Sequence, residues 1–196
     1  MTKTDPVRLG FCLTGSFCTF EEVFAQMARC KELGYDILPI FSEHAAGMDT
    51  RFGRGADHVA RARELCGREP ICTIQAAEPI GPADMIDILV VAPCTGNTLA
   101  KLNLAITDTA ATMAVKSHLR RGRPVVVAPS TNDALKGSAK NIGALLSREH
   151  FYFVPFRQDN PKGKPASVVA DFALIPDTIK AALAGVQLQP VIRMLQ

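Results

Sequence analysis

The sequence lacks tryptophan, has only 4 histidines and contains no Cys-x-x-Cys pair. Its 6 cysteines are scattered, and most of them lie in apolar segments, where cysteine acts as a small hydrophobic residue. A zinc site or a disulfide framework is therefore not expected. A Gly-x-Ser-x-Gly elbow, a Walker lysine loop and a histidine cluster with metal-ligand spacing are also missing. These absences predict a protein with no bound metal and no obvious nucleophile.

Long apolar runs are absent as well. No stretch of about 18 uncharged apolar residues occurs, and no targeting segment precedes the first apolar run. We therefore expect a soluble, cytoplasmic protein that does not bind membranes. The formal net charge is only +3, and it is scattered apart from cations that crowd at 116–123. Cations there are typical of a helix C-terminus before Gly122, so nucleic acid is not an expected partner.

Apolar segments recur at the spacing of an α/β domain. The chain has 196 residues, of which 47% are hydrophobic, so we expect one domain over residues 1–196. Apolar, β-branched runs predict strands, and apolar residues at helical spacing predict the helices between them. The predicted strands are 7–13, 35–41, 71–74, 88–92, 123–129 and 151–155, and the predicted helices include 20–33, 56–66, 110–121, 138–148 and 177–184. This alternation predicts an α/β fold.

A segment near the middle of the chain organises the rest. The apolar residues at 88–92 predict a strand that is buried on both faces, and the small polar run at 93–98 cannot continue it. Thr95 or Asn97 can cap the helix that follows. The loop then presents free backbone N–H groups, hydroxyls and a carboxamide above the end of the strand.

A second strand of the same kind, 123–129, is followed by another small polar loop at 130–133. Strand, helix and strand in one sheet imply parallel strands joined by a right-handed crossover. Both polar loops therefore lie at the carboxyl edge of the sheet, where open α/β sheets bind their ligands.

Two further segments have an open interpretation. The loop after the first strand, at 14–18, is small, polar and contains a glycine, which suits an anion such as phosphate. Thr-Gly-Ser is equally a common turn, and the full Gly-x-Gly-x-x-Gly fingerprint is missing, so this loop alone leaves both interpretations open. A polar, basic segment at about 157–167 fits either a solvated loop or a lid over the same edge.

Several motifs together resemble one protein family, the flavoproteins that include the phosphopantothenoylcysteine and peptidyl-cysteine decarboxylases. The motifs that carry this resemblance lie at 92–102, 106–108 and 127–132. The family has a Pro-Ala-Ser-Ala-Asn-Thr-like loop at the first of them and an Ala-Pro-Ala-Met-Asn-like loop at the last. Residues 78–82 and 152–156 are similar to a branch of the family that serves as one component of a two-component oxidoreductase in spore-forming bacteria. The likeness extends over about residues 7–192.

The resemblance implies a three-layer, Rossmann-like (flavodoxin-like) parallel sheet with helices on both faces. It also implies that FMN binds at the carboxyl edge, where subunits of a homo-oligomer meet, either a trimer or a multiple of three. The apolar end of the chain at 191–195 likewise needs a surface that covers it. Matched to the family's motifs, Asn97 and Thr95 are the expected catalytic residues, which orient the substrate. The expected FMN contacts are Thr14, Gly15, Ser16, Phe17, Ser42, Gly96, Thr98, Ser130, Thr131 and Asn132.

Two functions of different classes follow from the resemblance. In the first, the chain is an oxidoreductase subunit that helps to convert the cyclic dicarboxylate intermediate of lysine biosynthesis into dipicolinate. The chain would work in the mother cell of a spore-forming bacterium. Its partner would be a second subunit of the same enzyme, the A subunit, which binds NAD(P). Arg157, Lys162 and Lys164 would then bind the carboxylates of the substrate. In the second, the chain is a non-catalytic binding or scaffold subunit whose flavin site is vestigial.

The motifs also depart from those of the decarboxylases. Thr95-Gly96 replaces the usual Ser-Ala, and Ser130-Thr131 replaces Ala-Met. Pro79 stands where the decarboxylases have a catalytic histidine. Because a proline side chain can neither donate nor accept a proton, we do not expect this chain to decarboxylate a cysteine derivative.

Overall fold

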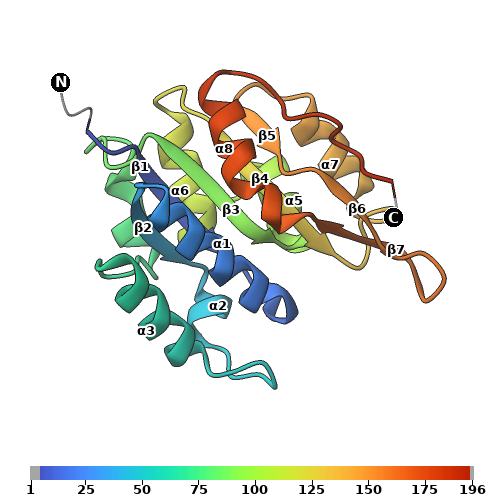
Figure 1. The fold of residues 1–196 in the computed structure, drawn as a ribbon, viewed down its shortest axis with the longest axis horizontal. Helices are drawn as coiled ribbons and strands as arrows, with labels where there is room; N and C mark the ends of the chain where they lie inside the picture. The colour runs from blue at the N-terminus through green and yellow to red at the C-terminus, as the bar shows by residue number, and fades with distance from the viewer. Residues whose placement is uncertain (1–4, 195–196) are drawn as a thin grey trace.

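A mixed sheet lies at the centre of the computed structural model, which describes residues 5–194 (Figure 1). The strands are β1 (Arg8–Leu13), β2 (Asp36–Phe41), β3 (Ile88–Cys94), β4 (Val125–Thr131), β5 (Phe151–Phe153), β6 (Phe156–Asn160) and β7 (Lys164–Ala170). Their order across the sheet is β2-β1-β3-β4-β7-β6, and β5 pairs with β4 beside this path. The strands from β1 to β5 pair in parallel, whereas β7 is antiparallel to both β4 and β6. Leu195, at the apolar end of the chain, lies outside the described residues.

Helices cover both faces of the sheet (Figure 1). They are α1 (Phe20–Glu32), α2 (Glu43–Gly47), α3 (Gly55–Cys66), α4 (Ile74–Ala77), α5 (Gly96–Asn103), α6 (Ala110–Leu119), α7 (Ala139–Leu146) and α8 (Ile175–Leu183). On one face α1 packs against α8, and on the other α5 packs against both α6 and α7. At the β2 edge of the sheet, α3 packs against α1, α2 and β2.

The central strand β3 shows why the chain forms these layers. Every residue of Ile88–Cys94 is buried, and β1 and β4 pair with the strand on its two sides. A strand that is apolar at every position can be covered only when both faces of the sheet carry helices. The α/β fold with a mostly parallel sheet between two helical layers is therefore confirmed.

One predicted strand is wrong. At 71–74 only Ile71 touches the sheet, through a single bridge to Ile40. Thr73 instead caps α4, since its side chain accepts the N–H of Ala76 at 3.2 Å. A hydroxyl that satisfies the first turn of a helix favours helix over strand, so the β-branched residues of this short run do not form a ladder.

The polar segment at about 157–167, predicted as a solvated loop or a lid, forms a hairpin. β6 ends at Asn160, β7 begins at Lys164, and the Gly163 N–H closes the tip by donating to Asn160 Oδ1 at 2.9 Å. Of the turn-forming residues that suggested a loop, Pro161 and Gly163 lie at this tip, whereas Asp159, Asn160 and Pro165 lie in the two strands. The rest of the segment is ordered because β7 pairs with the end of β4.

The remaining observations concern the cysteines, possible membrane-spanning helices and possible metal sites. All 6 cysteines are unpaired, and Cys18 is exposed. No helix in the part of the chain that the structure describes is long and apolar enough to cross a membrane. Within residues 5–194, no three His, Cys, Asp or Glu side chains are grouped so that they could hold a metal ion.

Candidate functional site

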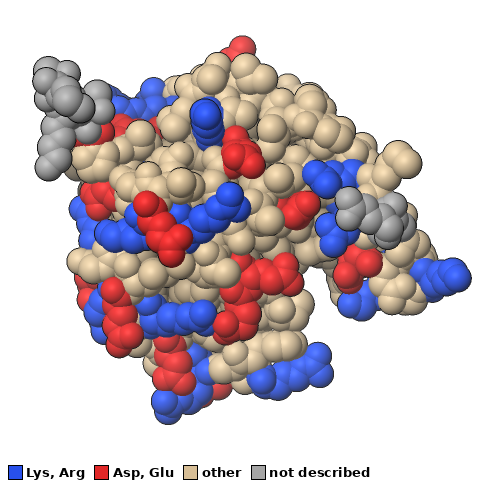
Figure 2. Space-filling model, viewed as in Figure 1, with Lys and Arg blue, Asp and Glu red and all other residues tan. Residues whose placement is uncertain are grey.

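Three loops meet at the carboxyl edge of the parallel strands, as the crossover rule predicts. They follow β1 at 14–16, β3 at 95–97 and β4 at 132–133, and two hollows open between them. The larger hollow has a volume of about 1130 Å³ and the smaller one of about 280 Å³. The hairpin forms one wall of the larger hollow, which lies beside the notch below the hairpin in Figure 2.

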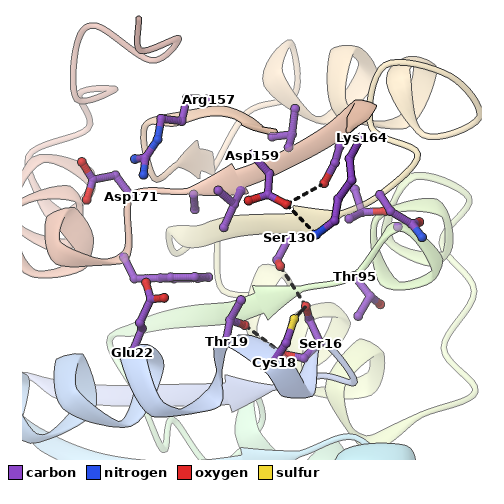
Figure 3. Close-up of a pocket in the computed structure, with 18 of the residues that line it drawn as sticks. Ser16, Cys18, Thr19, Glu22, Thr95, Ser130, Arg157, Asp159, Lys164 and Asp171 are labelled. Atoms are coloured by element: carbon purple, nitrogen blue, oxygen red, sulfur yellow. Dashed lines mark hydrogen bonds and ion pairs between the residues drawn. The ribbon is translucent and has the colours of Figure 1, made fainter. Parts of the chain in front are cut away.

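Hydrogen bonds between the loops hold this edge together. The Thr14 hydroxyl donates to the carbonyl of Pro93 at 2.6 Å and accepts the N–H of Thr95 at 3.1 Å. The hydroxyls of Ser16 and Ser130 lie 2.8 Å apart and join the loop after β1 to the end of β4 (Figure 3). Because the Thr14 side chain is buried and bonded to both Pro93 and Thr95, it holds the two loops together.

The loop after β3 presents free backbone N–H groups and a carboxamide, as the sequence predicts. Thr95 caps α5, because its hydroxyl accepts the N–H of Thr98 at 3.2 Å. Asn97 is exposed, and its side chain forms no hydrogen bond with any described residue, so Asn97 is not the cap. The backbone N–H groups of Gly96 and Asn97 also have no acceptor within residues 5–194. A helix N-terminus with two free donors and a carboxamide attracts an anion or a carbonyl oxygen.

The residues predicted to contact FMN divide between the two hollows. Gly15, Thr95 and Asn97 line both hollows and so form their shared wall. The smaller hollow is also lined by Thr14, Phe17, Ser42 and Thr98, and the larger one by Ser16, Gly96, Ser130, Thr131 and Asn132. Every predicted contact therefore borders one hollow or the other, although the two sets face different spaces.

Carboxylates outnumber cations in the larger hollow. Its acidic residues are Glu22, Asp133, Asp159 and Asp171, and its basic residues are Arg157 and Lys164. Arg157 and Asp171 lie at one end of the hollow and Thr95 at the other (Figure 3). An anion in this hollow therefore binds only where N–H donors or a guanidinium outweigh the repulsion of the carboxylates.

The three basic residues predicted to bind substrate are not equivalent in the structure. Lys164 Nζ forms an ion pair with Asp159 at 3.1 Å, and the Ser167 hydroxyl donates to the same carboxylate at 3.4 Å (Figure 3). Lys162 lies exposed at the tip of the hairpin and lines neither hollow. Arg157 lines the larger hollow and forms no ion pair with another described residue. Arg157 is therefore the best-placed cation of the three.

The thiols beneath the site carry no charge at neutral pH. Cys94 ends β3 directly before the exposed loop, and burial raises the pKa of its thiol well above its usual range. Burial likewise raises the pKa of the Cys12 thiol on the neighbouring strand. A thiol held in its protonated form is a poor nucleophile, so these two residues act as packing under the loops.

Sequence reasoning missed several residues of the site. His44, Lys101 and Thr109 line the smaller hollow, and Glu22, Asp133 and Asp171 line the larger one. Lys101 Nζ lies 2.8 Å from Asp108, and this contact lowers the pKa of that carboxyl. For His44 and Asp133 a signal was present, because both stand one or two residues after a polar residue at a strand end. The others come from helices or from the residues just before them, and only the folded structure brings them to the loops.

Comparisons with known proteins agree with this arrangement. The family model described as Flavoprotein matches residues 1–186. The B subunit of dipicolinate synthase from Bacillus subtilis (strain 168) is 44% identical over 192 residues, which are 98% of this chain and 96% of that protein. The crystal structure of the B subunit of dipicolinate synthase from Bacillus halodurans C is 42% identical, covers 97% of each chain and has a TM-score of 0.89.

A more distant relative shows the fold alone. Burkholderia xenovorans DmrB, solved in complex with FMN, is 19% identical over 93% of this chain and 97% of its own, with a TM-score of 0.68. The two closer similarities confirm the branch that the motifs predicted. Since the family model extends over the whole sheet and the helices of both faces, the chain belongs to the flavoprotein family.

Proposed function

We propose that this chain is the flavin-binding B subunit of a two-subunit dipicolinate synthase and that it works with an NAD(P)-binding A subunit. The similarity to the B subunit of dipicolinate synthase over 98% of the chain supports the assignment. The observation that carries the catalytic role is the shared wall of the two hollows. There Asn97 presents its carboxamide and backbone N–H to a space large enough for both a cofactor and a substrate.

The smaller hollow suits the phosphate end of FMN. Ser42, Thr109 and Lys101 line it, and hydroxyl groups donate hydrogen bonds to phosphate. Lys101 is paired with Asp108 at 2.8 Å, so its ammonium would share its charge between that carboxylate and the phosphate. A Cβ atom added at Gly15 would have no neighbours nearer than the Phe17 ring at 3.6 Å, so a ligand has room above this loop. FMN, when bound, supplies a ring that accepts two electrons as a hydride.

The larger hollow is then the place of the dicarboxylate. Arg157 can hold one carboxylate through two parallel N–H bonds, whereas Lys164 is already neutralised by Asp159. The free N–H groups of Gly96 and Asn97 lie at the other end of the same hollow and can hold the second carboxylate. We therefore propose that Arg157 carries most of the charge recognition that the sequence assigned to three basic residues.

In the proposed reaction the protein must mainly orient the substrate ring. It does not need a proton-transfer group at position 79, where the decarboxylases have a histidine. Conversion of a dihydro ring to dipicolinate removes a hydride and a proton and keeps both carboxylates. Asn97 orients the ring through its carboxamide, and Thr95 adds a hydroxyl to the same wall. Pro79 is exposed and lines neither hollow. We propose that this chain does not decarboxylate cysteine-derived acids, because Pro79 has no side-chain group that could transfer a proton.

The colour of the purified protein tests the cofactor. We expect the protein, when it is purified in the presence of FMN, to retain the yellow flavin absorbance after gel filtration. That absorbance should bleach, without oxygen, when the dihydro-dicarboxylate and the NAD(P)-binding partner are supplied. A protein that retains no flavin, or whose flavin does not respond while product forms, would favour the scaffold function, with all chemistry on the partner.

Substitution of Asn97 tests the catalytic role. We expect Asn97→Ala to reduce dipicolinate formation by the two-subunit enzyme about 100-fold, the order expected when a reacting ring is no longer oriented. Asn103→Ala, at the other end of α5 and outside both hollows, is the matched control and should retain activity. Full product formation by Asn97→Ala, or release of carbon dioxide from a peptidyl cysteine by the unaltered protein, contradicts the assignment.

We also propose a homo-oligomer, a trimer or a multiple of three, in the cytoplasm of the mother cell. Several large apolar side chains are exposed, among them Leu104 at 65% and Ile192 at 68%. Exposed apolar surface of this kind is stabilised when another chain covers it. Light scattering at low protein concentration is the measurement, and a stable monomer would contradict the proposal.

A further inference from the structure

Asp133 joins two segments at the wall of the larger hollow. Its Oδ1 atom accepts the Thr131 hydroxyl at 2.6 Å and the Ser138 hydroxyl at 2.9 Å. Its backbone carbonyl accepts the N–H of Lys136 at 2.9 Å and that of Ser138 at 3.2 Å. The end of β4 and the residue before α7 are thus tied to one carboxylate, which cannot rotate without losing both hydroxyl donors.

This cluster lies directly against the first residue of α5. A Cβ atom on Gly96 would lie 2.7 Å from Ser138 Oγ, 2.7 Å from Thr131 Oγ1 and 2.8 Å from Asp133 Oδ1. These separations are too short for any side chain larger than hydrogen, so the three oxygen atoms form a tight seat for the Gly96 backbone. The next residue along the helix is Asn97, whose position therefore follows from this seat.

We propose that Asp133 is a positioning residue for the flavin and substrate site, because it fixes the seat of Gly96 and thereby the first turn of α5. Asn97 and its neighbouring N–H donor then face the hollows at a set place without bonds of their own to hold them. This inference rests on the proposed function and names the residue that arranges its binding wall. Asp133 acts through Thr131, Ser138 and Gly96.

A role as the catalytic base makes a different prediction. Asp133 also lines the larger hollow, and its Oδ2 atom accepts no hydrogen bond from any described residue, so a proton could be taken up there. Asparagine keeps an oxygen that accepts from Thr131 and Ser138 but cannot take up a proton at neutral pH. Asp133→Asn therefore preserves a positioning residue and removes a base, whereas Asp133→Ala removes both.

The first experiment needs no cofactor. The N–H groups of Thr98 and Leu99 are bonded to Thr95, so their hydrogen exchange reports on the first turn of α5. We expect Asp133→Ala to accelerate their exchange about tenfold, the change that follows the loss of one or two hydrogen bonds, and Asp133→Asn to leave it near the original rate. Exchange in Asp133→Ala as slow as in the original protein overturns the proposal.

The second experiment uses FMN titration and kinetics of the two-subunit enzyme. We expect Asp133→Ala to bind FMN about tenfold more weakly and Asp133→Asn to keep both FMN affinity and kcat. A large loss of kcat in Asp133→Asn with normal FMN affinity would identify a base and overturn the positioning role. Unchanged FMN affinity and kcat in Asp133→Ala, despite faster exchange, overturns it too.

Two further variants keep the outcome interpretable. Ser138→Ala removes one of the two hydroxyl donors and should show the same changes to a smaller degree, which covers the case that Asp133→Ala fails to fold. Asp177→Ala, an exposed carboxylate in the first turn of α8 that lines neither hollow, is the control. If the original protein binds no FMN, the proposed function fails, and the exchange experiment still decides whether Asp133 fixes this turn.

Discussion

The two ends of the same strands are built for different tasks. At the amino edge, Arg8 at the start of β1 lies 2.6 Å from Asp87, which directly precedes β3. Arg123, before β4, lies 2.9 Å from Asp84 and 3.2 Å from Asp87. β1, β3 and β4 thus each begin beside a charged side chain that a residue of another segment neutralises. Charges that satisfy one another in this way close the amino edge.

At the carboxyl edge the same strands end in small and uncharged groups. The hydroxyls of Ser16 and Ser130 bond to each other, yet the N–H groups of Gly96 and Asn97 have no acceptor in the described chain. Unsatisfied donors cost stability unless a ligand or water completes them. With binding at the carboxyl edge, as we propose, stability is concentrated at the opposite edge of the sheet, so substitutions should separate the two.

The largest expected effect is acid unfolding through the amino edge. His118 is buried, its Nε2 atom lies 3.1 Å from the carbonyl of Pro124, and burial lowers its pKa to about 4. The unfolded chain binds this proton near pH 6.5, so it holds more protons than the folded chain between pH 6.5 and about 4. Stability therefore falls as the pH is lowered through this window, by about 3 kcal/mol.

Urea unfolding at pH 7 and pH 4.5 measures this effect. We expect the free energy of unfolding to fall between the two values in the original protein and to change less in His118→Gln, which cannot take up a proton. Since His118 lines neither hollow, FMN affinity at pH 7 should be the same in both proteins. An equal pH dependence in the two proteins contradicts the assignment to His118.

The next largest effect is expected from Asp87→Ala. The Asp87 carboxylate accepts hydrogen bonds from the backbone N–H and the guanidinium of Arg8, and it also forms an ion pair with Arg123. Its removal leaves both guanidinium groups without this partner. We expect the free energy of unfolding to fall by about 2 kcal/mol, the order for lost charge-assisted hydrogen bonds. Asp57→Ala breaks an exposed pair with Arg54 on the surface of α3, where solvent screens the charges, and should cost much less than Asp87→Ala.

The folded fraction of Asp87→Ala should bind FMN as the original protein does. Denaturant unfolding and FMN titration on the same sample check both statements. Weaker FMN binding by folded Asp87→Ala would mean that the two edges of the sheet are coupled, and the comparison would fail.

Gly96→Ala should have the opposite profile. Its methyl group meets three oxygen atoms at 2.7 to 2.8 Å, so the first turn of α5 must move outward. We expect FMN affinity to fall about tenfold, or about 1.4 kcal/mol, with a smaller change in unfolding. Gly143→Ala in α7, whose Cβ atom would have nothing within 4 Å, is the matched control and should bind FMN normally. Normal FMN binding by Gly96→Ala would mean that the seat does not matter.

The fold and the place of the candidate site follow from local sequence patterns. The apolar run Ile88–Cys94 predicts a doubly covered strand, and strand-helix-strand order then places the loops after β3 and β4 at one edge. Both arguments use only periodicity and the handedness of crossovers. For this reason the parallel part of the sheet was predicted well.

Contacts between distant segments could not be read from the sequence. The hairpin at the end of the sheet forms because β7 pairs with β4, which no local pattern in its turn-rich tip indicates. The same holds for Lys164, because its distance to Asp159 depends on the register of β6 and β7. The seat of Gly96 on Asp133 needs three-dimensional packing of segments that are far apart in the chain.

The smallest expected effect distinguishes the basic residues of the hairpin. Arg157→Ala removes a guanidinium that lines the larger hollow without an ion pair among the described residues, so its N–H donors are available to the substrate. We expect KM for the dicarboxylate to rise about fivefold, or about 1 kcal/mol. Lys164→Ala should change KM less than about twofold, because the ammonium shares its charge with Asp159 and so offers less of it to the substrate. Lys162→Ala, at the exposed tip, is the control of equal charge and should leave KM unchanged. If both lysine variants raise KM as much as Arg157→Ala does, the whole hairpin acts as a basic surface, and the selective role of Arg157 at the binding edge is wrong.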